Sequence, residues 1–287
     1  MRLEEYDVST QYAARVLTSQ RLTPSESTEE VRELILEAES DTFHASVGQN
    51  IGVLAPGRRE LGQEHHYRLY SVADVPRVTA DGRQQLSICV RRCNYIDAFS
   101  GEEYPGVASN YLCDLQPGEM LTITGPYGQA FALPREHDAN MILIGAGTGI
   151  APFRAFIKHI YQRRPDFGGS ILLVHGAQTG LELLYQNDEK NDFAMYYDRG
   201  TFEAVEALSK RPGWSDSIDW QGPLKQRATM ISQLLQDPKT YVYLAGLVEI
   251  RDQLDQVFAE VVGSVDQWQQ WKTTMEADGR WVELLYS

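Results

Sequence analysis

The chain has 287 residues, which is long enough for about two domains, and its 43% hydrophobic content is ordinary for a globular protein. Its formal net charge of −14 at pH 7 argues against nucleic-acid binding. No run of 18 apolar residues predicts a membrane span and the polar start lacks a signal-peptide pattern, so we expect a cytoplasmic protein. Three cysteines, at 89, 93 and 113, fit neither a disulfide framework nor the spacing of iron–sulfur ligands.

The first half reads as β-rich. Short apolar runs alternate with Pro-Gly and Asp-Gly turn signals, a pattern that predicts an antiparallel barrel or sandwich. The polar segment 18–30 is expected to be a loop. The expected strands of this half are 50–54, 68–72, 86–91 and 120–124.

After residue 138 strands and helices alternate, which predicts a parallel sheet flanked by helices. The expected strands are 141–144, 171–174, 203–208 and 241–244, and the expected helices are 151–164, 187–198, 230–236, 249–262 and 266–277. We therefore expect an antiparallel β-barrel domain over 1–135, followed by an α/β domain over 136–287.

The most informative segment is 141–154, where a short apolar strand leads into Gly145, Gly147 and Gly149 and then into a helix with Pro152 in its first turn. Outward-pointing N–H groups, a helix dipole and bare glycines let a pyrophosphate approach closely. The spacing is G-x-G-x-G, not the standard dinucleotide fingerprint. An ordinary tight turn between strand and helix is the alternative.

Two further motifs lie in the β-rich half. By the two-residue period of a strand, Arg68 and Tyr70 share one face, which suits a ligand with a phosphate and a flat ring. The segment 106–112 adds a glycine turn and small residues before a helix start, again suited to phosphate. The adjacent His65 and His66 face opposite ways in a strand, so no metal site is expected.

Together with 243–247, these segments resemble the plant-type ferredoxin–NADP⁺ reductase family over residues 12–287, in family order. The resemblance implies a barrel that binds FAD and an α/β domain that binds NADP(H). It implies electron transfer between NADPH and a separate one-electron carrier, a [2Fe–2S] ferredoxin or a flavodoxin. The arginine-rich barrel would then be the docking face, and a monomer is favoured.

The resemblance also assigns roles to single residues. Arg68 would hold the FAD pyrophosphate, Tyr70 would stack on the isoalloxazine and Ser71 would hydrogen-bond near flavin N5, where hydride arrives. The full set implied for FAD is Arg68, Leu69, Tyr70, Ser71, Cys89, Arg91, Tyr95, Gly106, Val107, Ala108 and Ser109, with Tyr95 on the adenine.

For the second cofactor, Thr148 would lie beside the nicotinamide, between Gly147 and Gly149 at the pyrophosphate. The segment Ser209, Lys210 and Arg211 resembles the family's reader of the NADP 2′-phosphate, although it could be a solvated basic turn. The family's adenine-stacking tyrosine has no exact match. The candidates for that position are Leu224, Trp214, Trp220 and Lys225.

The C-terminus departs from the family pattern Val-Glu-x-Tyr, because one extra residue separates Glu283 from Tyr286 and one more follows. We expect Tyr286 to cover the flavin and Glu283 to join Ser71 in a polar path for the N5 proton. Alanines at 108 and 245 also stand where the family often has cysteine.

Two other functions are weighed against the main one. The first is an NADH-preferring ferredoxin reductase component of an oxygenase or P450 system. The second is a flavin-bearing subunit that has lost efficient hydride transfer, which Ala245 and the shifted terminus would allow.

Overall fold

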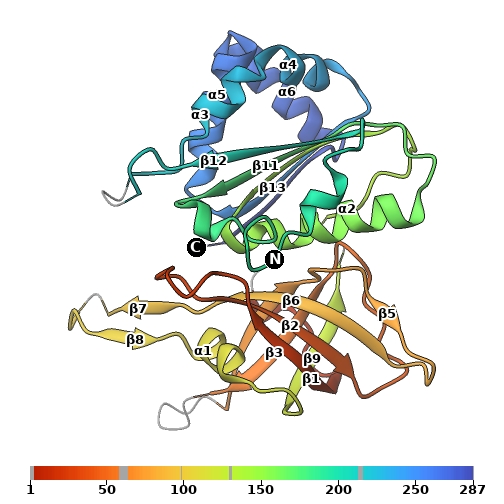
Figure 1. Cartoon of the computed structure of the whole chain (residues 1–287), viewed down its shortest axis with the longest axis vertical. Coiled ribbons are helices and arrows are strands. Elements are labelled where there is room, and N and C mark those ends of the chain that lie inside the picture. Colours follow the sequence, from red (N-terminus) through yellow and green to blue (C-terminus); the bar gives the residue numbers. More distant parts are fainter. Residues whose placement is uncertain (1–2, 58–63, 98, 129–130, 213–215, 287) are drawn as a thin grey trace. The chain divides into compact units, whose positions relative to one another are not determined.

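The computed structural model describes residues 3–57, 64–97, 99–128, 131–212 and 216–286 (Figure 1). The chain forms two compact units, Met1–Ala132 with Arg154–His159, and Leu133–Phe153 with Ile160–Ser287. Across the described ranges, every helix is too short or too polar to cross a bilayer.

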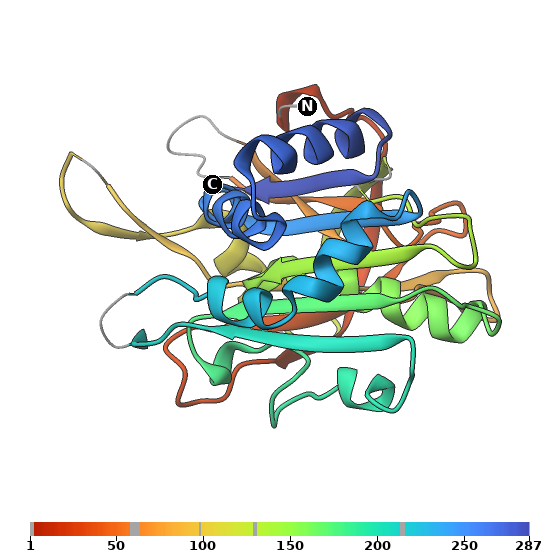
Figure 2. The same cartoon turned by 90° about the horizontal axis from the view of Figure 1, so that it is seen from above.

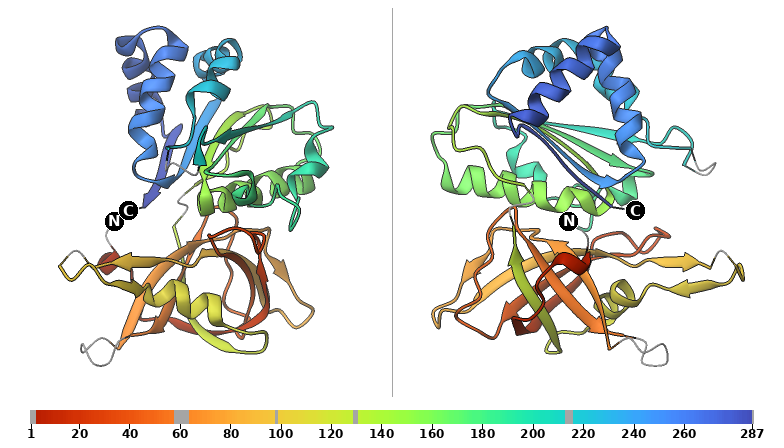
Figure 3. Two further views of the ribbon diagram at one scale, coloured as in Figure 1. Left: turned by 60° about the vertical axis from the view of Figure 1, so that its left-hand side comes forward. Right: turned by 180° about the vertical axis from the view of Figure 1, so that it is seen from behind.

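The first unit is built on a seven-stranded antiparallel sheet in the order β4-β3-β9-β1-β2-β6-β5. Its strands are β1 (Gln11–Arg21), β2 (Val31–Ala38), β3 (Asn50–Pro56), β4 (His65–Ser71), β5 (Arg77–Val78), β6 (Gln84–Arg91) and β9 (Met120–Tyr127). The sheet curls around one apolar core, to which α1 (Val107–Asp114) adds Leu112 (Figure 3). A hairpin of β7 (Asn94–Ile96) and β8 (Glu103–Pro105) extends from this unit.

The strands β1 and β2 are not foreseen by the sequence pattern, and the loop expected over 18–30 is wrong for its first residues. β1 runs on to Arg21, pairing Ser19 with Leu34 and Gln20 with Glu33. Ladder hydrogen bonds join backbone groups, so polar side chains do not prevent the pairing. Within β1 only Ala14 and Val16 are fully buried, and later half-buried positions carry the polar Ser19 and Arg21, so apolar residues do not mark the inner face.

The second unit contains a five-stranded parallel sheet in the order β12-β11-β10-β13-β14. The strands are β10 (Asn140–Ala146), β11 (Ile171–Ala177), β12 (Phe202–Leu208), β13 (Thr240–Leu247) and β14 (Trp281–Tyr286). The helices are α3 (Gln221–Gln226), α4 (Ala228–Gln236), α5 (Ile250–Val262) and α6 (Val265–Ala277), together with α2 (Ala151–Arg163), of which Arg154–His159 belong to the first unit. Helices α3 to α6 pack on one face of the sheet, over a core that includes Trp220, Phe258 and Trp268 (Figure 2). The predicted two-part architecture, antiparallel and then parallel, is confirmed.

The helix expected over 187–198 is wrong. The chain there makes turns and a short 3-10 segment, Phe193–Tyr196. The Asn187 side-chain oxygen accepts the N–H groups of Glu189 and Lys190, and this local bond competes with helix formation. The pattern also missed the strand β14, the short strands β5, β7 and β8, and the short helix α3.

The first unit contains a buried ion pair between Arg154 and Glu33. Both are about 2% exposed, and Arg154 Nη1 donates to Glu33 Oε1 at 2.6 Å and to the Ala73 carbonyl at 2.9 Å. Asp74 accepts from Arg154 Nη2 at 2.9 Å. Burial alone would raise the Asp74 pKa, but the charges of Arg154 and Lys158 outweigh it and lower that pKa. The buried charges are therefore compensated, as burial requires.

In the second unit His175 is fully buried in β11, with Nδ1 3.2 Å from Gln186 Oε1. Burial lowers its pKa to about 4, against 6.5 for an exposed histidine, and the Gln186 bond opposes the shift only in part. Nε2 has no hydrogen-bond partner among the described residues. His175 is therefore neutral in the folded protein at neutral pH.

The lowered pKa predicts a pH-dependent stability. Between pH 6.5 and pH 4 the unfolded chain binds a proton at His175 that the folded chain does not. The contribution of His175 to stability is therefore lost as the pH falls, by up to about 1.4 kcal/mol per pH unit. Thermal denaturation at pH 7.5 and pH 5.5 should show a smaller loss for His175→Gln than for wild type. The exposed His44→Gln serves as control, and equal losses in all three proteins would contradict the prediction.

Candidate functional site

The glycine turn after β10 is shaped by a close backbone approach. A Cβ on Gly149 would lie 2.3 Å from the Ala245 carbonyl oxygen of β13, so only glycine fits there. Gly147 has φ +53°, and a Cβ on it would meet nothing within 4 Å. One glycine thus lets the turn (Gly147–Ile150) pack against β13, and the other leaves the space above the turn open to a ligand.

Thr148, within this turn, lies next to the C-terminal strand. Its Oγ1 is 3.0 Å from the Tyr286 hydroxyl, and Tyr286 is 41% exposed. Pairing of β14 with β13 aligns Tyr286 with Leu247 and so fixes its place. Two residues predicted to act at the nicotinamide and the flavin are therefore neighbours.

Glu283 lies on the other face of β14. Its Oε2 is 2.7 Å from Arg251 Nε in α5, and its Oε1 accepts from Trp281 Nε1 at 2.8 Å. Lys272 of α6 lies 3.7 Å from the same Oε1. Because side chains alternate along a strand, the extra residue puts Glu283 and Tyr286 on opposite faces. The structure thus separates these two predicted catalytic residues and binds Glu283 in an ion-pair network.

The basic turn after β12 has acidic partners that the sequence pattern did not reveal. Lys210 Nζ is 3.1 Å from Asp219 Oδ2, and Arg211 Nε is 2.8 Å from Asp216 Oδ2. Ser209 is 8% exposed and forms an isolated bridge with Ile218, which folds the chain back on itself. The only sequence signal was the recurrence of aspartate five to nine residues after the cations.

The four candidates for an adenine-stacking residue differ in their surroundings. Leu224 is fully buried and Trp220 is 2% exposed, and both belong to the core under α3 to α6. Neither can therefore stack on a ligand. Lys225 forms an ion pair with Glu260 at 2.7 Å. Trp214 lies outside the described residues.

In the first unit four of the residues predicted for FAD, 68–71, lie on β4. Ser71 pairs with Asn50 of β3, and Ser71 Oγ donates to Asn50 Oδ1 at 2.9 Å. Asn50 is buried and was not singled out from the sequence. Tyr70 packs against the barrel core, and burial raises its pKa, so it is a neutral aromatic platform. Leu69, which precedes Tyr70 in β4, pairs with Gly52.

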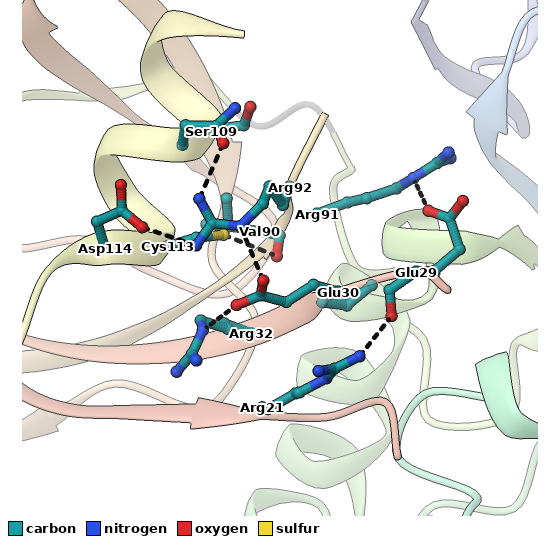
Figure 4. Close-up of polar contacts among 12 residues, drawn as sticks. Arg21, Glu29, Glu30, Arg32, Val90, Arg91, Arg92, Ser109, Cys113 and Asp114 are labelled. Atoms are coloured by element: carbon teal, nitrogen blue, oxygen red, sulfur yellow. Dashed lines mark hydrogen bonds and ion pairs between the residues drawn. The ribbon is translucent and has the colours of Figure 1, made fainter. Parts of the chain in front are cut away.

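Arg68 is exposed, and its Nη1 donates to the Tyr67 carbonyl at 2.8 Å. Within the described ranges no carboxylate forms an ion pair with it, so this guanidinium is available to a phosphate. By contrast, Arg91 is paired with Glu29 at 2.5 Å. Figure 4 shows that pair beside Arg92, which lies between Glu30 and Asp114.

The start of α1 forms a second anion-compatible feature. Gly106 is its N-cap, and no described side chain caps the helix, so its first N–H groups, at Val107 and Ala108, are available. Ser109 Oγ accepts the Cys93 N–H at 3.2 Å. A Cβ on Gly106 would lie 2.7 Å from the Cys93 carbonyl oxygen, so a glycine is needed for this approach.

The remaining predicted residues are Cys89 and Tyr95. Cys89 is buried within β6. Tyr95, on the extended hairpin, is 46% exposed and stacks on Tyr104 with ring centroids 5.7 Å apart. Tyr95 thus has a free face for a further ring.

Comparison with known proteins extends this picture. Residues 143–255 match the family described as the oxidoreductase NAD-binding domain. The chain is 32% identical to the ferredoxin–NADP reductase of Thermosynechococcus vestitus, over 93% of this chain and 70% of the relative. The chain belongs to the ferredoxin–NADP reductase family. It is also 27% identical to the chloroplastic enzyme of Spinacia oleracea, over 99% of this chain and 78% of that protein.

The fold is likewise shared. The ferredoxin–NADP⁺ reductase structure from Plasmodium falciparum superposes with a TM-score of 0.73 at 21% identity, covering 98% of both chains. At that identity the likeness speaks for the fold alone.

The close approach at Gly149 yields a test. In Gly149→Ala the new Cβ would collide with β13 backbone, which cannot move without disturbing the sheet. We expect a loss of about 1–3 kcal/mol in unfolding free energy. Gly180→Ala, where a Cβ meets nothing within 4 Å, should change it by less than about 0.5 kcal/mol. Chemical denaturation measures both, and equal stabilities would show that the turn has room to move.

Proposed function

We propose that this chain is an FAD-dependent oxidoreductase that transfers electrons between NADPH and a separate one-electron carrier, a [2Fe–2S] ferredoxin. The observation that carries the proposal is the open glycine turn, in which Gly149 packs on β13 while Gly147 leaves room above it. The relatives that match over almost all of the chain are named ferredoxin–NADP reductase, and this supports the same activity here.

The residues of the first unit fit FAD. Arg68 and the uncapped start of α1 offer charge and N–H groups to a pyrophosphate, and Tyr70 offers a neutral ring to an aromatic system. Bound FAD supplies hydride acceptance and one-electron release, the chemistry that amino acids lack. Ser71 would hold a hydroxyl close to flavin N5, with its direction set by Asn50.

The residues of the second unit fit NADP(H). Gly147 and Gly149 leave the backbone accessible to the pyrophosphate. Thr148 would lie beside the nicotinamide, and Tyr286, whose hydroxyl is 3.0 Å from Thr148 Oγ1, would cover the flavin. Ser209, Lys210 and Arg211 would meet the 2′-phosphate. Because Glu283 is engaged with Arg251 and Trp281, we propose that it stabilises β14 and that Ser71 manages the N5 proton without it.

The first test of the proposed activity is the absorbance spectrum of the protein. The purified protein should show a flavin absorbance band that NADPH bleaches under anaerobic conditions. Added ferredoxin should then support cytochrome c reduction. An acidic carrier docking near Arg68 should do so more slowly as ionic strength rises. A colourless protein that cannot be reconstituted with FAD would overturn the proposal.

The residue roles predict a contrast between two variants. Ser71→Ala should slow flavin reduction by NADPH by about 100-fold and change its pH profile, because a positioned hydroxyl is lost. Glu283→Gln should leave the rate and its pH profile close to wild type and lower the thermal midpoint. Stopped-flow absorbance gives the rates, and FAD titration of the apoprotein checks cofactor binding. A pH profile altered in Glu283→Gln would restore this residue to the proton path.

A further inference from the structure

We propose that Asp216 and Asp219 are specificity-determining residues that hold Lys210 and Arg211 and so lower the preference of this chain for NADPH over NADH. The inference rests on the proposed function, because it concerns the segment assigned to the NADP 2′-phosphate. It concerns only that subsite and leaves the flavin chemistry unchanged.

The Asp219 carboxylate is held firmly. Its Oδ2 lies 3.1 Å from Lys210 Nζ, while its Oδ1 accepts the Gly222 N–H at 3.1 Å near the start of α3. Burial would raise the Asp219 pKa, but the Gly222 bond and Lys210 outweigh it and lower that pKa. At neutral pH the carboxylate is therefore charged, and its side chain is only 18% exposed.

Arg211, the next residue in the chain, and Lys225 of α3 are paired with carboxylates in the same way. Arg211 meets both oxygens of Asp216, at 2.8 and 3.4 Å, and Lys225 lies 2.7 Å from Glu260. Thus each of these three cations, all within the described ranges, is matched by a carboxylate. The subsite is charge-balanced, whereas a reader of phosphate is expected to carry net positive charge.

Charge balance has opposite consequences for the two nucleotides. A 2′-phosphate must compete with Asp216 and Asp219 for the cations and is repelled by both carboxylates. A ribose 2′-hydroxyl is neutral, and a carboxylate can accept its hydrogen bond, as acidic residues do in NAD sites. Specificity is the difference between the affinities for the two nucleotides. The aspartates weaken NADPH binding and favour NADH binding, so they reduce this difference in two ways.

Ser209 supplies a second, independent observation at this position. Its Oγ is buried and has no hydrogen-bond partner among the described residues. A buried hydroxyl left without a partner costs about 1–3 kcal/mol, so a ligand oxygen that reached it after a local movement of its neighbours would be favoured. A phosphate and a hydroxyl both have such an oxygen, and the aspartates therefore decide between them.

The test measures binding without turnover. Calorimetry on the flavin-loaded protein compares 2′-phospho-AMP with AMP, in wild type, Asp219→Asn and Asp216→Asn. Asparagine keeps an oxygen for the Gly222 N–H and removes only the charge. We expect each variant to bind 2′-phospho-AMP about threefold more tightly at low salt, with AMP binding unchanged or weaker. Asp198→Asn changes an exposed aspartate in the turn before β12, removes the same charge and should change neither.

A double-mutant cycle separates competition from a general charge effect. Lys210→Ala should weaken 2′-phospho-AMP binding less in wild type, where Asp219 occupies the lysine, than in Asp219→Asn. The ratio of kcat/KM for NADPH to that for NADH should rise in both aspartate variants. Unchanged ratios and equal Lys210→Ala effects would overturn the inference. If wild type is reduced by neither nucleotide, the proposed function itself fails, which is a distinct result.

Discussion

The close approach of Gly149 to the backbone of β13 is the constraint on which the second unit depends. The parallel pairing of β10 with β13 brings Gly145 opposite Ala245, and the turn that follows must cross the end of β13 at a distance that excludes any side chain. Thr148 takes its place from that crossing, and Tyr286 takes its place from the pairing of β14 with the same strand. The absence of a side chain at Gly149 thus fixes where the glycine turn and β14 come together.

Most of the architecture could be predicted from the sequence, because the strongest sequence patterns arise within single strands and turns. The strands β10 and β11 are buried on both faces and appear in the sequence as continuous apolar runs. The turn after β10 could be predicted from its closely spaced glycines. β1 could not be predicted in this way, because many of its side chains are polar. Its pairing with β2 depends on backbone hydrogen bonds, which the side chains do not reveal. The expected helix over 187–198 failed for the converse reason, because the Asn187 side chain bonds its own neighbours.

The same distinction between local and distant contacts applies to the candidate site. The placement of Arg68 and Tyr70 on one strand could be predicted from their spacing. Partners brought in by register or by a returning loop could not. Asn50 meets Ser71 only because β3 and β4 pair in one particular register. Asp219 meets Lys210 only because the chain folds back through the bridge between Ser209 and Ile218.

The extra residue in β14 limits what substitutions can change. A strand repeats every two residues, so no substitution can bring Glu283 and Tyr286 onto one face; only removal or addition of a residue between them can. Point mutation can alter the chemistry on either side of this strand, but the two sides stay independent. The face with Tyr286 and the face with Glu283 can therefore be substituted separately.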